Sequence, residues 1–254
     1  MSNLESIDRY RTLRMGDVAP DFEARSTRGP IRLSGFRGRW LVFFSHPADF
    51  TPVCTTEFVS LAKAYDRFVA LDCALLGLSV DSLYSHLAWL RAIRDVFDVE
   101  VPFPVIEDPS MVVGRTYGMI EEEATNTARV RATYFIDPEG VIRAITHYPL
   151  TIGRSTDEML RMVAALQATY SGARLAPADW RQKQPLLLPA DEKAQHEAPL
   201  AIPRGRRRCR REASQIRAAA AADDPFSAAP RGEIGQRNRY GNGNRSTWAE
   251  PATR

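Results

Sequence analysis

The chain has 254 residues, of which 44% are hydrophobic and 26% charged, and its formal net charge is +3. This composition is that of a soluble globular protein, with length for one large domain or two small ones. It contains no secretory-type apolar segment near the N-terminus, no run approaching the roughly 18 apolar residues that span a bilayer, and only three cysteines, which excludes a secreted disulfide scaffold. We therefore expect a cytoplasmic protein with reduced thiols and no membrane partner.

Apolar runs and amphipathic segments alternate along the first two thirds of the chain. The pattern predicts buried strands at 40–45, 73–80 and 103–108, and helices over 54–69, 82–97, 110–118 and 156–170, the second of them capped by Asp81 or Ser82. Pro138 and Gly140 form a turn between two further strands, 130–137 and 141–148. This order of elements favours an α/β fold whose sheet is covered on both faces.

The composition changes abruptly after about Lys193. Residues 194–254 contain twelve arginines, no lysine and six acidic residues, whereas the preceding chain has 22 basic and 25 acidic residues. Leu, Ile, Val and Phe together number five in this segment, which is too few to form a core. We therefore expect 194–254 to be a disordered basic tail, and the proline-punctuated residues 173–193 before it to be extended.

Cys54 lies in the stretch FFSHPADFTPVCTTEF, at the first turn of the helix predicted from this residue. A free cysteine has a pKa of about 8.5 and is mostly protonated at neutral pH, whereas the thiolate is the nucleophile. Unpaired N–H groups and the helix dipole favour the thiolate at a first turn. Thr51 could hydrogen-bond the sulfur or a bound oxygen, while Pro47 and Pro52 stiffen the approach and could shield the site from water. These residues favour a reactive cysteine; the alternative is a cysteine that only packs at a helix start.

The residues before Cys54 fit the Pro-x-x-x-Thr-x-x-Cys motif of the peroxiredoxins, and SHPADFTPVCTTE resembles the 1-Cys subgroup, which is related to the alkyl hydroperoxide reductases and thiol-specific antioxidants. Other stretches resemble this subgroup in order and approximate spacing: LGLSVDS (76–82), FPVIED (103–108), VRATYFIDPEG (130–140), YPLTIGRS (148–155) and PADWRQKQPLLLP (177–189). The resemblance covers roughly residues 12–193. It implies a thioredoxin-like fold, with a central mixed β-sheet flanked by helices, over 12–172, and the start of a C-terminal extension over 173–193.

The resemblance also implies the chemistry of the site. The thiolate of Cys54 would attack the terminal oxygen of a peroxide and become a sulfenic acid. Thr51 would hydrogen-bond the peroxide, and Pro47 would shield the cysteine. Arg131 would hold the sulfur and the peroxide oxygens and stabilise the charge that develops as the O–O bond breaks. No cofactor is implied, and the sequence has no Cys-x-x-Cys pair or spaced histidine cluster that suggests a metal.

Three further residues are supporting candidates, each with a structural alternative. His46 adjoins the active turn, where the resembled subgroup has a histidine near the cysteine, but it could equally be a histidine with a structural hydrogen bond. Glu57 follows Cys54 by three positions and could orient an arginine or face solvent. Arg154 matches a second arginine that the family brings near the site, with a surface arginine as the alternative.

The other two cysteines receive different interpretations. Cys73 begins an apolar strand and is expected to pack as a small hydrophobic residue. Cys209 lies in RGRRRCRR, where the neighbouring positive charges should make it reactive. Some relatives of the subgroup have resolving cysteines in the C-terminal region, so Cys209 is a candidate resolving residue. An incidental thiol in a flexible tail is the preferred alternative.

The tail departs from the family, whose C-terminal dimerisation domain is not recognisable after about Lys193. Translation from a shifted reading frame is one hypothesis, and it fails if neither other frame of the gene encodes a family-like segment. The basic tail could also bind nucleic acid through phosphate contacts, but little aromatic interleaving accompanies the arginines, so nucleic acid is not an expected partner. Some 1-Cys members are phospholipases that use a serine just before the first core strand. Here Arg39 occupies the serine position, so we expect no lipase activity at that site.

The leading interpretation is a peroxidase of hydrogen peroxide and alkyl hydroperoxides that acts in antioxidant defence. It would be recycled by an external thiol reductant of the thioredoxin, glutaredoxin or glutathione type, and the family implies a homodimer or a higher homo-oligomer. A redox sensor or chaperone-like protein that is oxidised but turns over poorly is the main alternative. A thioredoxin-like disulfide reductase is disfavoured because CTTE places no second cysteine near Cys54.

Overall fold

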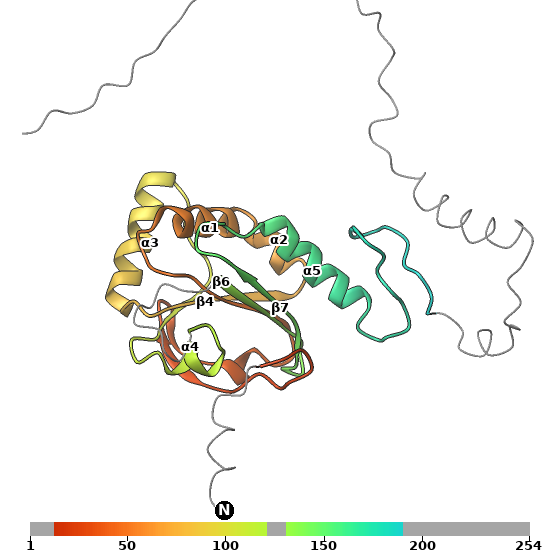
Figure 1. Ribbon diagram of the computed structural model, residues 1–254. Coiled ribbons are helices and arrows are strands. Elements are labelled where there is room, and N and C mark those ends of the chain that lie inside the picture. Colours follow the sequence, from red (N-terminus) through yellow and green to blue (C-terminus); the bar gives the residue numbers. More distant parts are fainter. Residues whose placement is uncertain (1–12, 121–130, 190–254) are drawn as a thin grey trace, which may run out of the picture. The chain divides into compact units, whose positions relative to one another are not determined.

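The structure, a computed structural model, describes residues 13–120 and 131–189 (Figure 1). Its strands are β1 (Glu23–Ser26), β2 (Gly29–Arg32), β3 (Trp40–Ser45), β4 (Cys73–Ser79), β5 (Val105–Glu107), β6 (Arg131–Ile136) and β7 (Ile142–Tyr148). Its helices are η2 (Leu33–Phe36), which is a 3-10 turn, and α1 (Pro52–Lys63), α2 (Tyr65–Val69), α3 (Leu83–Phe97), α4 (Val112–Thr116) and α5 (Thr156–Ala168).

These strands form one mixed sheet in the order β2-β1-β5-β4-β3-β6-β7. The central strands β3, β4 and β5 are parallel, because helices connect them, whereas β6 is antiparallel to both β3 and β7. The predicted strands, the predicted hairpin and the predicted fold class, a central mixed sheet flanked by helices, are therefore confirmed.

Strand β3 contributes side chains to both hydrophobic clusters, one on each face of the sheet. All six of its residues are buried, which explains why WLVFFS is an uninterrupted apolar run rather than an alternating one. Val42 and Phe44 belong to the cluster formed with α1, α2, α3 and α5, whereas Leu41 and Phe43 belong to the cluster on the opposite side. Figure 1 shows the same division, with α1, α2, α3 and α5 on one face of the sheet and α4 on the other.

The hairpin of β1 and β2 at one edge of the sheet was not predicted. Its two strands have four residues each, and most of their side chains are polar or exposed, so the apolar signal is weak. The sequence signal for this hairpin was Gly29, which lies between the apolar residues Ala24 and Ile31 that pair across it. In the structure Gly29 has a φ of +98°, which a tight turn requires and glycine readily adopts.

The helix predicted over 54–69 differs from the structure in two ways. It begins earlier, at Pro52, whose fixed φ is suited to the first helical position. It is also divided into α1 and α2 at Ala64, where φ is −96° and ψ is 4°. Cys54 is therefore the third residue of α1 and still lies in its first turn.

The segment after α5 folds back instead of running extended as predicted. Leu175 and Leu187 exchange backbone hydrogen bonds of 2.9 and 2.8 Å, and the side chain of Trp180 is buried against Ala164 and Ala165 of α5. The predicted tail over 194–254 lies outside the described residues. Among the helices of the described part of the chain, none combines the length and apolarity needed to cross a membrane.

Candidate active site

Cys54 lies in the first turn of α1, which follows β3 through the loop of residues 46–51. Thr51 is the N-cap residue, and its extended backbone carbonyl accepts the first intrahelical bond from the N–H of Thr55 at 3.0 Å. The side chain of Cys54 is fully buried. The N–H groups of a first turn have no intrahelical partner, so the position favours a negative charge on the sulfur.

Arg131, the first residue of β6, brings its guanidinium group to Cys54. Nη1 lies 3.4 Å from the Sγ atom of Cys54 and donates to Oε2 of Glu57 at 2.8 Å. Nε and Nη2 donate to the carbonyl oxygen of Leu150 at 3.2 and 3.0 Å. These contacts fix the plane of the guanidinium group and leave its positive charge beside the sulfur, where it stabilises a thiolate.

Glu57 lies one helical turn after Cys54, between two arginines. Besides the bond from Arg131, it accepts hydrogen bonds from the backbone N–H of Arg154 at 2.7 Å and from Nε and Nη2 of that arginine at 2.8 and 2.9 Å. Burial by itself would raise the pKa of Glu57, but the hydrogen bonds and charge of Arg154, with the charge of Arg131, outweigh burial and lower it. The carboxylate therefore holds both arginines, and Glu57 does not face solvent.

Arg154, which lies just before α5, is buried rather than on the surface. Its Nη1 donates to the carbonyl oxygen of Ala132 at 3.1 Å and to Oγ1 of Thr133 at 3.3 Å, both on β6. Its guanidinium carbon lies 5.0 Å from the ring centroid of Phe44, a cation–π contact. Among the described residues, Arg154 is linked to Cys54 through Glu57 and Arg131, so its support of the site is indirect.

Thr51 and Pro47 both belong to the loop of residues 46–51. The hydroxyl of Thr51 donates to the carbonyl oxygen of Ala48 at 2.9 Å. That bond uses the hydroxyl proton and leaves the oxygen as an acceptor, so Thr51 can accept a hydrogen bond from a peroxide O–H group. Pro47 is buried.

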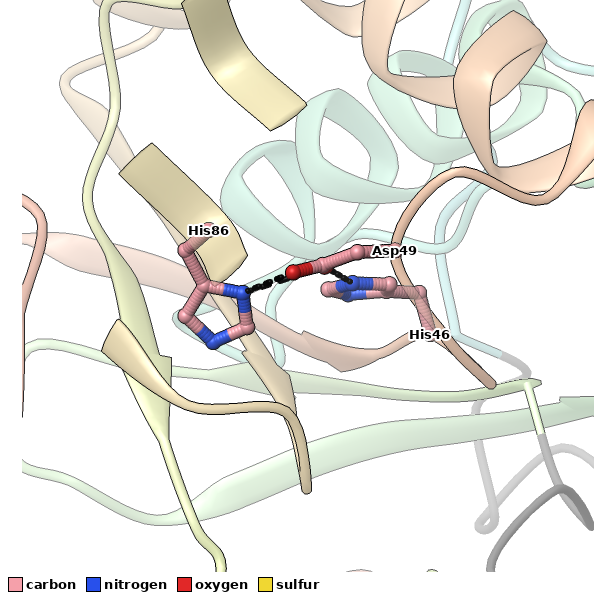
Figure 2. Close-up of side chains that lie close together, drawn as sticks. All are labelled: His46, Asp49 and His86. Carbon is pink, nitrogen blue, oxygen red and sulfur yellow. Dashed lines mark hydrogen bonds and ion pairs between the residues drawn. The ribbon is translucent and has the colours of Figure 1, made fainter. Parts of the chain in front are cut away.

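His46 belongs to a buried cluster that sequence reasoning missed. Its Nε2 lies 2.9 Å from Oδ1 of Asp49, and Asp49 in turn contacts Nδ1 of His86, which lies on α3 (Figure 2). Asp49 and His86 are 37 positions apart, so no local motif joins them. The only signal was the acidic residue inside the active turn. The structural alternative for His46 is therefore met by a hydrogen bond with Asp49.

The remaining cysteines and Arg39 lie apart from this site or outside the described residues. Cys73 is buried at the start of β4, as predicted, and burial raises the pKa of its thiol to about 12. Neither Cys54 nor Cys73 forms a disulfide. Cys209 lies outside the described residues. Arg39 is exposed and lies over the ring of Phe36.

Known proteins resemble this chain in both sequence and structure. The AhpC/TSA family profile matches residues 15–145. Peroxiredoxin 2 of Caldanaerobacter subterraneus subsp. tengcongensis is 48% identical over 186 residues, which are 73% of this chain and 84% of that protein.

Two solved structures extend the likeness to the fold. A yeast mitochondrial 1-Cys peroxiredoxin, solved to explain thiol resolution via the glutathione and thioredoxin systems, has a TM-score of 0.66 and 38% identity, over 70% of this chain and 87% of that chain. The reduced 2-Cys peroxiredoxin of Plasmodium vivax has a TM-score of 0.64 and 29% identity, and the match covers 72% of this chain and 98% of that chain. The chain therefore belongs to the AhpC/TSA family and is a peroxiredoxin, a thiol-dependent peroxidase of antioxidant defence.

Proposed function

We propose that Cys54 is the peroxidatic cysteine and that the enzyme is of the 1-Cys type, reducing hydrogen peroxide and alkyl hydroperoxides. The observation that carries this proposal is the 3.4 Å contact between Nη1 of Arg131 and Sγ of Cys54 at the first turn of α1. A guanidinium group and a helix N-terminus at one sulfur are the surroundings that favour a nucleophilic thiolate.

The proposed reaction begins with attack of the Cys54 thiolate on the terminal peroxide oxygen. An S–O bond forms, the O–O bond breaks, and the leaving oxygen takes up a proton and departs as water or an alcohol. The sulfur is oxidised to a sulfenic acid, and the peroxide is reduced. Arg131 stabilises the negative charge on the separating oxygens, and the hydroxyl oxygen of Thr51 accepts the hydrogen bond that orients the peroxide.

The 1-Cys assignment rests on this chain's cysteines, because both 1-Cys and 2-Cys structures resemble it. Cys73 is unsuited to resolve the sulfenic acid, since it is buried on β4 and its pKa is raised to about 12. An external thiol then attacks the sulfenic acid to give a mixed disulfide and water. A second thiol releases Cys54 and forms the oxidised reductant. A thioredoxin, glutaredoxin or glutathione can supply these thiols, and we propose a cytoplasmic homodimer or higher homo-oligomer as the working form.

The test is steady-state consumption of hydrogen peroxide with dithiothreitol, using the native chain, Cys54→Ser, Cys209→Ser and Cys73→Ser. We expect Cys54→Ser to abolish turnover and the other two variants to retain it. Loss of turnover in Cys209→Ser would replace the 1-Cys assignment with a resolving role for Cys209. One oxidation of the native chain without turnover would favour a redox sensor, and full activity of Cys54→Ser would refute the nucleophile.

A further inference from the structure

Both ring nitrogens of His86 face hydrogen-bond acceptors. Nδ1 lies 2.8 Å from Oδ2 and 3.0 Å from Oδ1 of Asp49, and Nε2 lies 3.2 Å from the carbonyl oxygen of Ile106 on β5. A neutral imidazole has one N–H group and could satisfy only one of these acceptors. Turning the ring by 180° would place carbon atoms at both positions and lose both bonds. The ring is fully buried, so solvent does not offer a substitute partner.

Asp49 does not supply the second proton. Burial by itself would raise the pKa of Asp49, but the hydrogen bonds with His46 and His86 outweigh burial and hold the pKa below its usual range. The carboxyl group is therefore ionised. A buried carboxylate is costly unless it is paired with a positive charge and hydrogen-bonded.

Two further acidic residues, Glu107 and Asp81, belong to the surroundings of Asp49 and His86. Burial alone would raise the pKa of Glu107 on β5, but a hydrogen bond from the backbone N–H of Leu83 and the ion pair with Arg25 lower it. Asp81, after β4, accepts the backbone N–H of Asp49 at 2.9 Å. The ring of His46 lies 6.0 Å from the ring of His86, centroid to centroid.

We propose that His86 is a positioning residue of the peroxidase site: it carries a proton on both ring nitrogens and, through Asp49, holds His46 as the tautomer with its hydrogen on Nε2. Asp49 accepts that hydrogen at 2.9 Å. Burial lowers the pKa of His46, so its ring is neutral and Nδ1 keeps a lone pair. Within the described part of the chain, this buried Nδ1 has no hydrogen-bond partner.

The functional consequence follows from the position of Asp49 and His46 on the chain. Both lie in the loop of residues 46–51, which leads from β3 into α1 and so to Thr51 and Cys54. Through Asp49, His86 ties this loop to α3, and through Ile106 it ties α3 to β5. Without these hydrogen bonds of His86, the loop of residues 46–51 would be held less firmly, and with it the position of Cys54, the proposed nucleophile.

The direct test is the ¹⁵N NMR signature of the histidine rings in the full-length, labelled protein at pH 7.5. The sequence has four histidines, so the signals can be assigned with single variants. We expect His86 to show two protonated nitrogens and His46 to show a proton on Nε2 and a bare Nδ1. The matched reference is His147, on β7, whose pKa is lowered by burial and whose ring should be neutral. A bare nitrogen on His86 would overturn the proposal whether or not Cys54 is the nucleophile.

Two substitutions separate the proposed role from a merely structural one. In His86→Asn the amide nitrogen takes the place of Nδ1 and can still donate to Asp49, whereas in His86→Gln it takes the place of Nε2 and cannot. A hydrogen bond to a charged group contributes about 1.5–3 kcal/mol, so we expect the rate constant for reaction with hydrogen peroxide to fall roughly tenfold or more in His86→Gln. We expect His86→Asn to retain more activity and the His46 tautomer, and His147→Asn to match the native chain. Equal losses in both His86 variants, with the His46 signals unchanged, would refute the positioning role.

A metal ion is the competing explanation, because one donor atom from each of His46, Asp49 and His86 lies within 4.8 Å of the others. A metal at Nδ1 of His86 would also leave Nε2–H to donate to a carbonyl. Titration with zinc chloride distinguishes the two cases. We expect the native chain and His86→Gln to bind zinc alike. If the native chain binds one zinc ion per chain and His86→Gln binds none, the proposal is overturned.

Discussion

At the scale of single residues, Arg131 divides its donors among three acceptors of different kinds. One nitrogen, Nη1, serves both the sulfur of Cys54 and the carboxylate of Glu57, while Nε and Nη2 serve the carbonyl oxygen of Leu150. A planar fork of fixed donors can make these contacts together, and a lysine ammonium group on a flexible stem cannot. The side chain therefore contributes geometry as well as charge.

Arg131→Lys tests this contribution. The variant keeps a positive charge but loses the fixed donors, so we expect the second-order rate constant with hydrogen peroxide to fall about ten- to a hundredfold, the equivalent of one or two charged hydrogen bonds. Stopped-flow oxidation of the reduced protein measures it. Arg143→Lys is the control, because Arg143 pairs with Asp137 on another part of the sheet. A native rate in Arg131→Lys would show that charge alone suffices.

At the scale of elements, one turn of α1 joins three parts of the fold. Cys54 and Glu57 are three positions apart and so lie on one face of the helix. Glu57 then pairs with Arg131 at the start of β6 and with Arg154 just before α5. Because the pair with each arginine is buried, removing the carboxylate leaves two buried positive charges without their partner.

We expect Glu57→Gln to lower the free energy of unfolding by about 3 kcal/mol or more at pH 7. Since the pKa of Glu57 is lowered in the folded state, its stabilisation is fully present above the unfolded pKa of about 4.3 and is lost as pH falls through the lower folded value. Urea unfolding at pH 7 and at decreasing pH below 4.3 measures both effects. The native chain should lose stability towards acid more steeply than Glu57→Gln. Glu100→Gln, at an exposed position, should follow the native chain; equal acid sensitivity in all three would contradict the linkage.

At the scale of the whole molecule, the contacts of Cys54 and Glu57 in the described residues come from α1, β6 and the segment before α5. The sheet has helices on both faces, and Trp180 anchors the segment after α5. The arginine-rich residues 194–254 have the composition of a segment without a core of its own. The tail is therefore not expected to contribute to the reaction of Cys54 with peroxide.

A chain ending at Lys193 tests this expectation. We expect it to fold and to react with hydrogen peroxide at the native rate, because it retains the residues that contact Cys54 in the described part of the chain. Rate measurement and thermal unfolding of both chains provide the comparison, and size-exclusion chromatography with light scattering reports whether the oligomer changes. A lower rate in the shortened chain would assign the tail a part in the reaction. Loss of the oligomer alone would assign it to assembly.

Prediction from the sequence succeeded where the signal is local. The apolar runs of β3, β4 and β6 and the periodicity of α3 and α5 are properties of neighbouring residues, and the structure confirms them. It missed β1 and β2, because short edge strands with exposed side chains bury little apolar surface. It also missed the division of a predicted helix at Ala64, where nothing in the sequence breaks the apolar period.

The sequence by itself determined the class of fold and placed Cys54 in the first turn of a helix. It could do so because strand periods, helix periods and the turn that contains Pro47 and Thr51 depend only on neighbouring residues. The family resemblance placed Arg131 and Arg154 near Cys54, but only the tertiary structure decided that Glu57 holds both arginines and that Asp49 meets His86. Glu57 and Arg154 are 97 positions apart, and Asp49 and His86 are 37 apart. Pairs so distant are brought together by the order of strands in the sheet and the packing of helices upon it, and no local pattern encodes that order.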